Sequence, residues 1–154
     1  SVSQEYLDPD TNDKFIPYII ESTVGCVRLV LAILDQAYEE ETLENGDTRE
    51  VLHLHPYLAP YKVAILPLMK KYHSEKAKEI CQQLSKEFFV SYDETGSIGK
   101  RYRRQDAIGT PYCVTIDEQT LENGTVTIRE RDTMQQEVIA LDALNDYIKN
   151  KIKF

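Results

Sequence analysis

The stretch that most suggests chemistry is "SIGKRYRRQDAIGTP", residues 97–111, because four cations fall within five of its positions. They are Lys100, Arg101, Arg103 and Arg104, and Tyr102 lies among them. On a helix, residues 100, 103 and 104 share one face. Guanidinium groups match phosphates with paired hydrogen bonds, and arginine and tyrosine planes stack on unpaired bases. The pattern is therefore typical of a contact to single-stranded RNA.

The same cluster has a second interpretation. Surface helices often carry cations that pair with nearby acids, and Asp93, Glu94, Asp106 and Glu130 are available for this. In that case the cluster would stabilise the fold and not bind a ligand. Composition alone does not decide between the two.

A second group of polar residues lies near the start of the chain. Glu21 ends an apolar run, a turn follows from Thr23 to Gly25, and Arg28 falls in the first turn of a predicted helix. A carboxylate suits an ammonium group, and a guanidinium at the positive end of a helix suits a triphosphate. Most strand-to-helix junctions carry no chemistry, so the residues alone indicate this site only weakly.

Two further motifs favour simpler interpretations. His53 and His55 of "HLH" would share one face of a strand, but no further ligands cluster near them in the sequence, so we expect no metal site. "DETGSIGK" has glycines and a lysine without the GxxxxGK[ST] spacing of a phosphate loop, and we expect a turn that enters a helix.

Apolar periodicity predicts the elements that position these residues. "FIPYIIE" (15–21) is expected to be a strand, and "GCVRLVLAILDQAYEE" an amphipathic helix that starts near Ser22 or Thr23. Asn45-Gly46 indicates a turn before a strand at "VLHLH". After Pro60 the pattern β-α-β-α-β-β-β-α predicts a mixed sheet with helices packed on it, with Ser74 as the N-cap of the first helix.

Charge is distributed unevenly along these 154 residues. Residues 1–50 hold twelve acids and three bases, net −9, whereas residues 51–154 hold fourteen acids and fifteen bases, net +1. The formal charge of −8 therefore does not exclude a polyanionic partner for the second part. No apolar run approaches the roughly 18 residues of a membrane span and no signal peptide is visible, so we expect a cytoplasmic protein without a membrane partner.

Several long blocks resemble one enzyme family. "VLHLHPYLAPYKVAILPL", "YDETGSIGKRYRRQDAIGTPYCVTID" and "GTVTIRERDTMQQEVIALDAL" resemble consecutive parts of the C-terminal region of glycyl-tRNA synthetases of the dimeric class II type. "FIPYIIESTVGCVRLVLAIL" is similar to motif 3 of that family. The resemblance covers essentially residues 15–152, but nothing in the chain is like motifs 1 and 2. It implies a C-terminal fragment of a longer enzyme.

The resemblance also implies a fold and a division of labour. Residues 1–58 would be the end of the catalytic domain, a strand-helix remnant with motif 3. Residues 59–154 would be an α/β anticodon-binding domain with a mixed sheet surrounded by helices. Arg28 would be catalytic and hold ATP, and Glu21 and Thr23 would bind glycine. Lys100, Arg101, Arg103 and Arg104 would contact the anticodon arm of tRNA-Gly.

The same resemblance sets expectations for partners and activity. The parent enzyme would be a homodimer that uses ATP with Mg²⁺ to activate glycine and charge tRNA-Gly, whereas the fragment alone would be inactive and would need no cofactor. The family's Glu-Pro-Ser is Glu21-Ser22-Thr23 here, and the loss of the proline leaves the substrate loop less constrained. A second departure is Val27, which precedes Arg28 where the family usually has glycine or a polar residue.

Two other classes of protein are possible from the sequence. A non-catalytic synthetase-like accessory protein, such as the processivity subunit of mitochondrial DNA polymerase, is similar in fold but would not need Glu21 and Arg28. A free-standing RNA-binding module would not need the strand and helix of residues 15–40.

Overall fold

A five-stranded mixed sheet forms the centre of the molecule. The computed structural model describes residues 4–43 and 46–153. The sheet has the spatial order β6 (Val90–Tyr92), β5 (Val63–Pro67), β7 (Tyr112–Ile116), β8 (Thr125–Glu130) and β9 (Gln136–Ala140). β5 is parallel to β6 and β7, whereas β8 is antiparallel to both β7 and β9. The predicted mixed sheet is confirmed.

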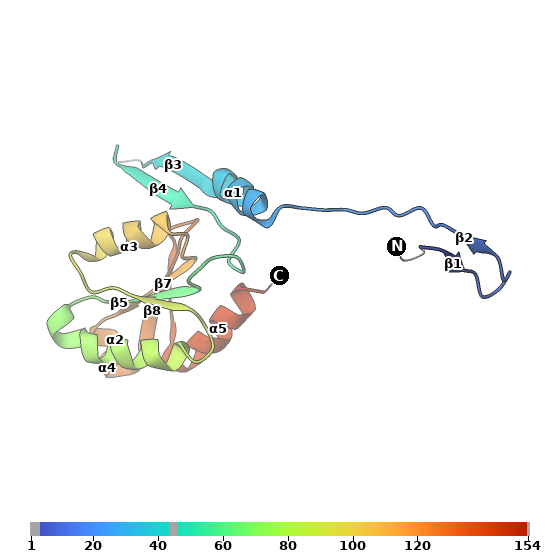
Figure 1. Ribbon diagram of the computed structural model, residues 1–154. Helices are drawn as coiled ribbons and strands as arrows, with labels where there is room; N and C mark the ends of the chain where they lie inside the picture. The colour runs from blue at the N-terminus through green and yellow to red at the C-terminus, as the bar shows by residue number, and fades with distance from the viewer. Residues whose placement is uncertain (1–3, 44–45, 154) are drawn as a thin grey trace.

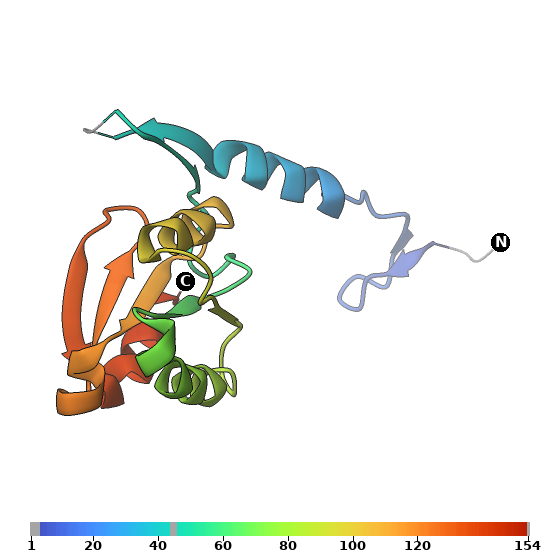
Figure 2. The ribbon, with the colours of Figure 1, turned by 90° about the vertical axis from the view of Figure 1, so that its left-hand side faces the viewer.

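Helices cover both faces of this sheet (Figures 1 and 2). α2 (Lys70–Leu84) and α5 (Leu144–Lys151) pack on one face, and α3 (Ile98–Ala107) packs on the other. Successive side chains of a strand point to opposite faces. β5 shows this: Val63 and Ile65 belong to the α2/α5 core, whereas Ala64 and Leu66 pack beneath α3. Every residue of β5 and β7 is buried, as expected for strands that are covered on both faces.

After Pro60 the strands and helices follow the predicted order, but the structure differs from the prediction in one additional helix and in one helix cap. A short helix, α4 (Glu118–Asn123), was not predicted; it begins with a capping box in which Asp117 accepts from the Thr120 N–H, and Gly124 at φ 65° ends it. The prediction of Ser74 as an N-cap was wrong. α2 begins after Met69, and the Ser74 hydroxyl donates to Glu94 at 2.9 Å.

A separate β-hairpin lies over α3. α1 (Cys26–Ala37) runs directly into β3 (Tyr38–Thr42), which pairs antiparallel with β4 (Thr48–Leu52). Asn45 of the predicted turn lies outside the described residues, whereas Gly46 has φ 84°. β4 packs on α3 and contributes the buried residues Arg49 and Val51. The hairpin therefore joins α1 to the sheet.

Residues 4–25 form an arm that extends away from the sheet (Figure 1). It holds β1 (Tyr6–Leu7) paired with β2 (Lys14–Phe15), and residues 16–25 form no helix or strand. The strand expected at 15–21 is thus wrong for this chain. A strand needs a neighbour to satisfy its backbone groups, but this segment is exposed, with Tyr18 and Ile20 fully open to solvent.

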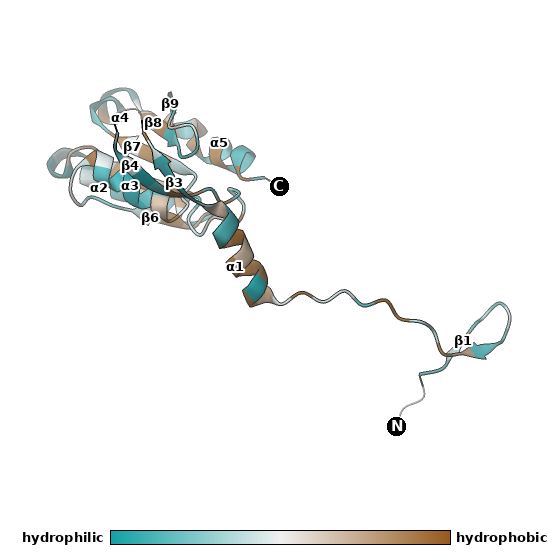
Figure 3. Cartoon of the chain, turned by 90° about the horizontal axis from the view of Figure 1, so that it is seen from above, coloured by the Kyte–Doolittle hydropathy of each residue, from teal (hydrophilic) through white to brown (hydrophobic). Residues whose placement is uncertain are grey.

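The helix expected after Gly25 does form, but its apolar side is uncovered. Val27, Val30 and Leu31 of α1 are more than half exposed, and Figure 3 shows the hydrophobic positions along the helix. Its N-cap is Gly25 and not Ser22 or Thr23, and no side chain caps it. Among the described helices, none is both long and apolar enough to cross a membrane.

The segment between the hairpin and β5 is tightly held. Lys62 Nζ donates to the carbonyl oxygens of Pro56, Tyr57 and Ala59 at 3.3, 2.5 and 2.8 Å. Burial lowers the pKa of this lysine. These three hydrogen bonds fold the connection back on itself, so that it is an ordered turn between the two parts of the molecule.

Gly109, in the connection between α3 and β7, offers a test of how closely the end of the hairpin packs on that connection. It has φ +81°, and a Cβ there would lie 3.0 Å from Leu54 Cδ1 and 3.1 Å from the Leu52 carbonyl oxygen. Gly124 also has positive φ, +65°, but open space around it. We expect Gly124→Ala to cost about 1–2 kcal/mol for the left-handed backbone alone, and Gly109→Ala to cost about 1–3 kcal/mol more because of the clash. Urea unfolding of both variants measures the difference, and equal losses would contradict this packing.

Candidate nucleic-acid interface

The basic cluster lies on α3, but its members point in different directions. Arg101 is buried: Nε and Nη2 donate to the Gly96 carbonyl at 3.2 and 2.7 Å, and Nη1 donates to the Pro67 carbonyl. These bonds join the end of β5 to the loop after β6. The Arg101 guanidinium is therefore occupied inside the fold.

Arg104 is exposed but also engaged. Its Nε and Nη2 donate to Asp93 Oδ2 at 2.8 and 2.5 Å, and Nη2 also donates to the Thr95 carbonyl at 2.6 Å. This arginine braces the loop that leads into α3. The alternative interpretation of the cluster, pairing with local acids, thus describes Arg104 well.

Lys100 and Arg103 point outward. Lys100 is exposed, and the Arg103 side chain is 39% exposed with its Nη1 4.0 Å from Asp106 Oδ2. The two residues are three positions apart and lie on the same side of the helix. Of the four cations, these two remain accessible to a phosphate.

Tyr102 is not the open aromatic plane that the sequence suggested. Its hydroxyl lies 2.6 Å from Thr115 Oγ1 on β7, and the Arg129 guanidinium carbon is 4.8 Å from its ring centroid. Burial is the main cause that raises its pKa. Tyr102 therefore packs against the sheet.

An exposed aromatic lies elsewhere, in a segment that sequence reasoning missed. Tyr72 at the start of α2 is 58% exposed, and Lys71 Nζ lies 5.3 Å from the centroid of its ring. The signal was present in "MKKYH", which directly follows the buried strand β5. Because β5 and β6 are parallel, their carboxyl ends meet at one edge of the sheet. Lys71, Tyr72 and Lys100, which we call the edge surface, all follow strands that end at this edge.

The acid Glu94 in the same region is already paired with a cation. Lys70 Nζ lies 2.7 Å from Glu94 Oε1. The pKa of Glu94 is lowered to about 2 by hydrogen bonds, first from Lys70 and then from Tyr92. Glu94 therefore stays ionised near neutral pH but has its own cation, which leaves Lys71 and Lys100 as the unopposed charges of the edge surface.

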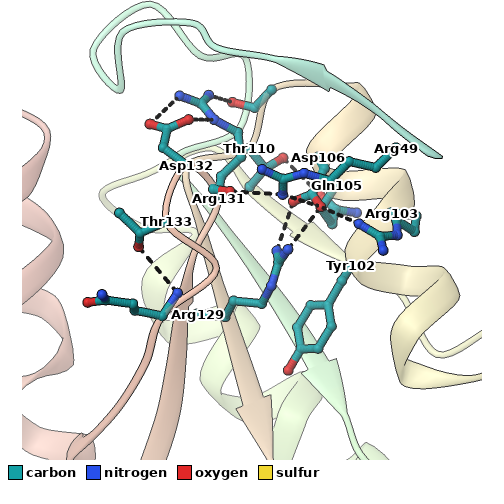
Figure 4. A network of polar contacts seen from close by, with 12 residues as sticks. Arg49, Tyr102, Arg103, Gln105, Asp106, Thr110, Arg129, Arg131, Asp132 and Thr133 are labelled. Carbon is teal, nitrogen blue, oxygen red and sulfur yellow. Dashed lines mark hydrogen bonds and ion pairs between the residues drawn. The ribbon is translucent and has the colours of Figure 1, made fainter. Parts of the chain in front are cut away.

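Behind α3 lies a network of buried charges centred on Asp106 (Figure 4). Asp106 is fully buried, and Arg129 binds it with two hydrogen bonds of 2.8 and 3.0 Å. Arg49 Nη1 of β4 donates to Asp106 Oδ2 at 3.2 Å and to the Arg131 carbonyl at 3.0 Å. One carboxylate on α3 thus connects the hairpin to β8.

Arg131 extends this network to the connection between the two parts. It is buried and donates to the carbonyls of Gly109 and Leu54 at 2.8 and 2.9 Å, while its Nε binds Asp132 Oδ1 at 2.7 Å. Burial opposes ionisation of Asp132, but hydrogen bonds from Arg131 and His53 outweigh it and lower the pKa of this carboxyl.

The structure corrects the argument about His53 and His55. No additional ligands were visible near them in the sequence, but folding brings Glu39 and Glu41 of β3 to His53, with one ligand atom of each residue within 4.8 Å of the others. His55 is not part of this group; its Nδ1 accepts the Tyr57 N–H at 3.2 Å.

The predicted glycine and ATP residues lie far from this network. Glu21, Thr23 and Arg28 are exposed, and among the described residues no hydrogen bond or ion pair joins Glu21 to Arg28. Glu21 and Thr23 belong to the irregular arm, and Arg28 to the first turn of α1. In the described part of the chain, Glu21 and Thr23 therefore lie outside the helix that carries Arg28, and all three side chains are open to solvent.

Comparison with known proteins identifies the family of the domain that contains the five-stranded sheet. The family described as "Anticodon binding domain" matches residues 62–151, which is more than half of the chain. The chain belongs to the anticodon-binding domain family. The match covers β5 to α5 and includes both the edge surface and α3.

Two relatives are similar to this chain over nearly its whole length, including the arm and α1, which lie outside the residues that the domain family matches. The chain is 60% identical over 149 residues to a glycine–tRNA ligase of Clostridium kluyveri, which covers 97% of this chain and 32% of the relative. A glycine–tRNA ligase of Geobacillus thermodenitrificans is 54% identical over the same shares. The chain thus spans about a third of the length of these curated relatives.

A solved structure supports the fold of the anticodon-binding domain. The RNA-binding domain of threonyl-tRNA synthetase from Cryptosporidium parvum Iowa II matches with a TM-score of 0.59 and 29% identity, over 64% of this chain and 25% of that one. The predicted fold class, a mixed sheet surrounded by helices in a synthetase anticodon-binding domain, is confirmed.

We predict that the Asp106 network holds the hairpin on the anticodon-binding domain. Asp106→Ala leaves Arg129 buried without its anion and removes one of the two carboxylates that bind Arg49, and we expect a loss of about 3–5 kcal/mol in the free energy of unfolding. Asp142→Ala removes an exposed carboxylate and should change stability by less than about 0.5 kcal/mol. Denaturant titration of both variants provides the measurement, and a loss from Asp106→Ala as small as that of the control would show that the network is not needed.

Proposed function

We propose that this chain is the C-terminal part of a glycine–tRNA ligase, and that residues 59–154 bind the anticodon arm of tRNA-Gly. The observation that carries the proposal is the 60% identity to a glycine–tRNA ligase across 97% of the chain, which includes the arm and α1 as well as the anticodon-binding domain. Residues 1–58 are then the end of the catalytic domain.

The uncovered side of α1 supports this division. Val27 and Leu31 are 83% and 67% exposed, and the irregular segment before them carries exposed Ile16, Tyr18 and Ile20. Large exposed apolar surfaces mark places where another part of a protein packs. Because the relatives are about three times longer, we assign this surface to the remainder of a catalytic domain.

For RNA, the geometry supports the outer side of α3 and the edge surface. Single-stranded bases stack on exposed aromatic rings while cations hold the phosphates. Tyr72 supplies such a ring, and Lys71, Lys100 and Arg103 supply cations. Arg103 has only a long ion pair, 4.0 Å to Asp106, and its side chain is 39% exposed. Arg101 and Arg104 serve the fold, and they position this surface.

In the intact enzyme, we assign glycine and ATP to the other end of the chain. Arg28 would stabilise the charge that develops on the ATP phosphates, Glu21 would bind the glycine ammonium, and Thr23 would line the same pocket. ATP with Mg²⁺ and a homodimeric parent complete the proposal. The relatives named above are ligases, which favours this function over a non-catalytic accessory protein.

Binding of an anticodon stem-loop tests the RNA assignment. We expect the 154-residue chain to bind the tRNA-Gly stem-loop, and Lys100→Ala or Arg103→Ala to weaken binding about tenfold through the loss of one charged hydrogen bond. Each should also reduce the salt slope by about 1.

Lys86→Ala is the matched control, because Lys86 follows α2 at the opposite edge of the sheet, next to the start of β5. Its binding should equal that of the wild-type chain. If Lys100→Ala and Arg103→Ala also bound as wild type, the assignment of α3 would be wrong. If the wild-type chain did not bind the stem-loop, the anticodon role itself would fail.

Glycine-dependent ATP–pyrophosphate exchange tests the role of Arg28 in the intact ligase. We expect Arg28→Ala to slow exchange by about 10²–10³, because a preorganised charge on the reacting phosphates is lost. Lys86→Ala should leave exchange unchanged. If the Arg28→Ala enzyme exchanged pyrophosphate at the wild-type rate, the assignment of Arg28 to the active site would be wrong.

A further inference from the structure

His53 lies between carboxylates on both sides of its ring. Nδ1 is 2.7 Å from Asp132 Oδ1, whereas Nε2 is 3.0 Å from Glu41 Oε1 and 3.5 Å from Glu39 Oε2. The ring is partly open to solvent, with 27% of the side chain exposed. Three acids therefore surround one imidazole, in a region that the proposed RNA contacts do not use.

The hairpin sets this arrangement through its register. Glu39 and Glu41 are two positions apart on β3 and so lie on the same face. His53 directly follows β4, and its backbone N–H donates to the Ala37 carbonyl at 2.7 Å, which continues the ladder by one residue. Pairing of the two strands thus places the imidazole beside both glutamates.

The distances fit the ligand shell of a small divalent cation. Zinc binds imidazole nitrogen and carboxylate oxygen at about 2.0–2.2 Å in a tetrahedron, whose ligand atoms are then about 3.3–3.5 Å apart. The Nε2 distances of 3.0 and 3.5 Å to the two glutamate oxygens lie around this value. An imidazole nitrogen between two carboxylates is also a mixed donor set, which distinguishes it from an ordinary group of surface acids.

Neighbouring groups orient two of the three ligands. In the neutral tautomer that donates Nδ1–H to Asp132, the lone pair of the ring is on Nε2 and faces the two glutamates, and Arg131 in turn holds Asp132. Arg49 Nε binds Glu41 Oε2 at 2.5 Å, and this leaves Oε1 directed at His53. A carboxylate behind the distal nitrogen is the usual partner of a metal-binding histidine.

We propose that Glu39, Glu41 and His53 form a binding site for a divalent cation, best suited to Zn²⁺, with Asp132 as the partner that orients His53. Three protein ligands leave a fourth position for water on the solvent side. A bound ion would fix β3 to the residue that follows β4, and through His53 and Asp132 to the anticodon-binding domain. The site would be structural, since it lies apart from the residues assigned to glycine and ATP.

Calorimetric titration of the metal-free 154-residue chain with ZnCl₂ tests the site. We expect the chain to bind one Zn²⁺, and Glu39→Gln and His53→Gln each to weaken binding at least tenfold. Asp132→Asn should weaken it by about 10–100-fold, the effect usual for such an orienting partner. Glu39 is 63% exposed, so Glu39→Gln keeps the fold and is the decisive variant. Circular dichroism confirms that each variant is folded.

His55→Gln is the matched control, because it removes the other histidine of the same motif, and Cys26→Ser removes the exposed thiol. Both should bind Zn²⁺ as the wild-type chain does. The proposal is overturned if the wild-type chain takes up no Zn²⁺, if Glu39→Gln and His53→Gln bind like wild type, or if Cys26→Ser abolishes uptake.

Discussion

The fold depends on one fully buried carboxylate, Asp106. A buried charge is tolerated only when cations and hydrogen bonds surround it. Here the partners come from two distant elements: Arg129 lies on β8, and Arg49 lies on the hairpin. The carboxylate is satisfied only when the hairpin, α3 and the sheet meet in one arrangement. Hydrophobic packing between these elements has no such directional demand, so the charges set the alignment.

This requirement explains why the number of arginines in the chain overstates the positive charge that the surface offers to a phosphate. Arg49, Arg101, Arg129 and Arg131 are all buried and bound to carbonyls or acids. Planar guanidinium groups suit this role, because each can serve several acceptors at once. The exposed lysines show the contrast: Lys71 and Lys100 take no part in the buried network. A cluster of cations in a sequence can therefore contain both residues that stabilise the fold and residues that remain available to a ligand. Burial of each side chain distinguishes the two.

Local signals in the sequence predicted the elements from β5 to α5 except the short helix α4, because each predicted element depends on periodicity and turns within its own residues. Of the strand expected at residues 15–21, only Phe15 is paired, in β2, since a strand needs a partner and residues 16–21 have none among the described residues. The pairing of Arg49 with Asp106 spans 57 positions and that of His53 with Asp132 spans 79. No pattern in a single sequence encodes such distant partners. The inward turn of Tyr102 was hidden for the same reason, because its partner Thr115 lies on another element.

The connection between the two ends of the molecule behaves as a rigid support and not as a switch. α1, which carries Arg28, passes into β3 without an intervening loop, and β3 is bonded along its length to β4. β4 is in turn fixed to α3 through Arg49 and Asp106, one helical turn from Arg103. A switch needs a second arrangement of similar free energy. Moving the hairpin would leave buried charges unpaired, at a cost of several kcal/mol. The position of α1 relative to α3 is therefore set during folding.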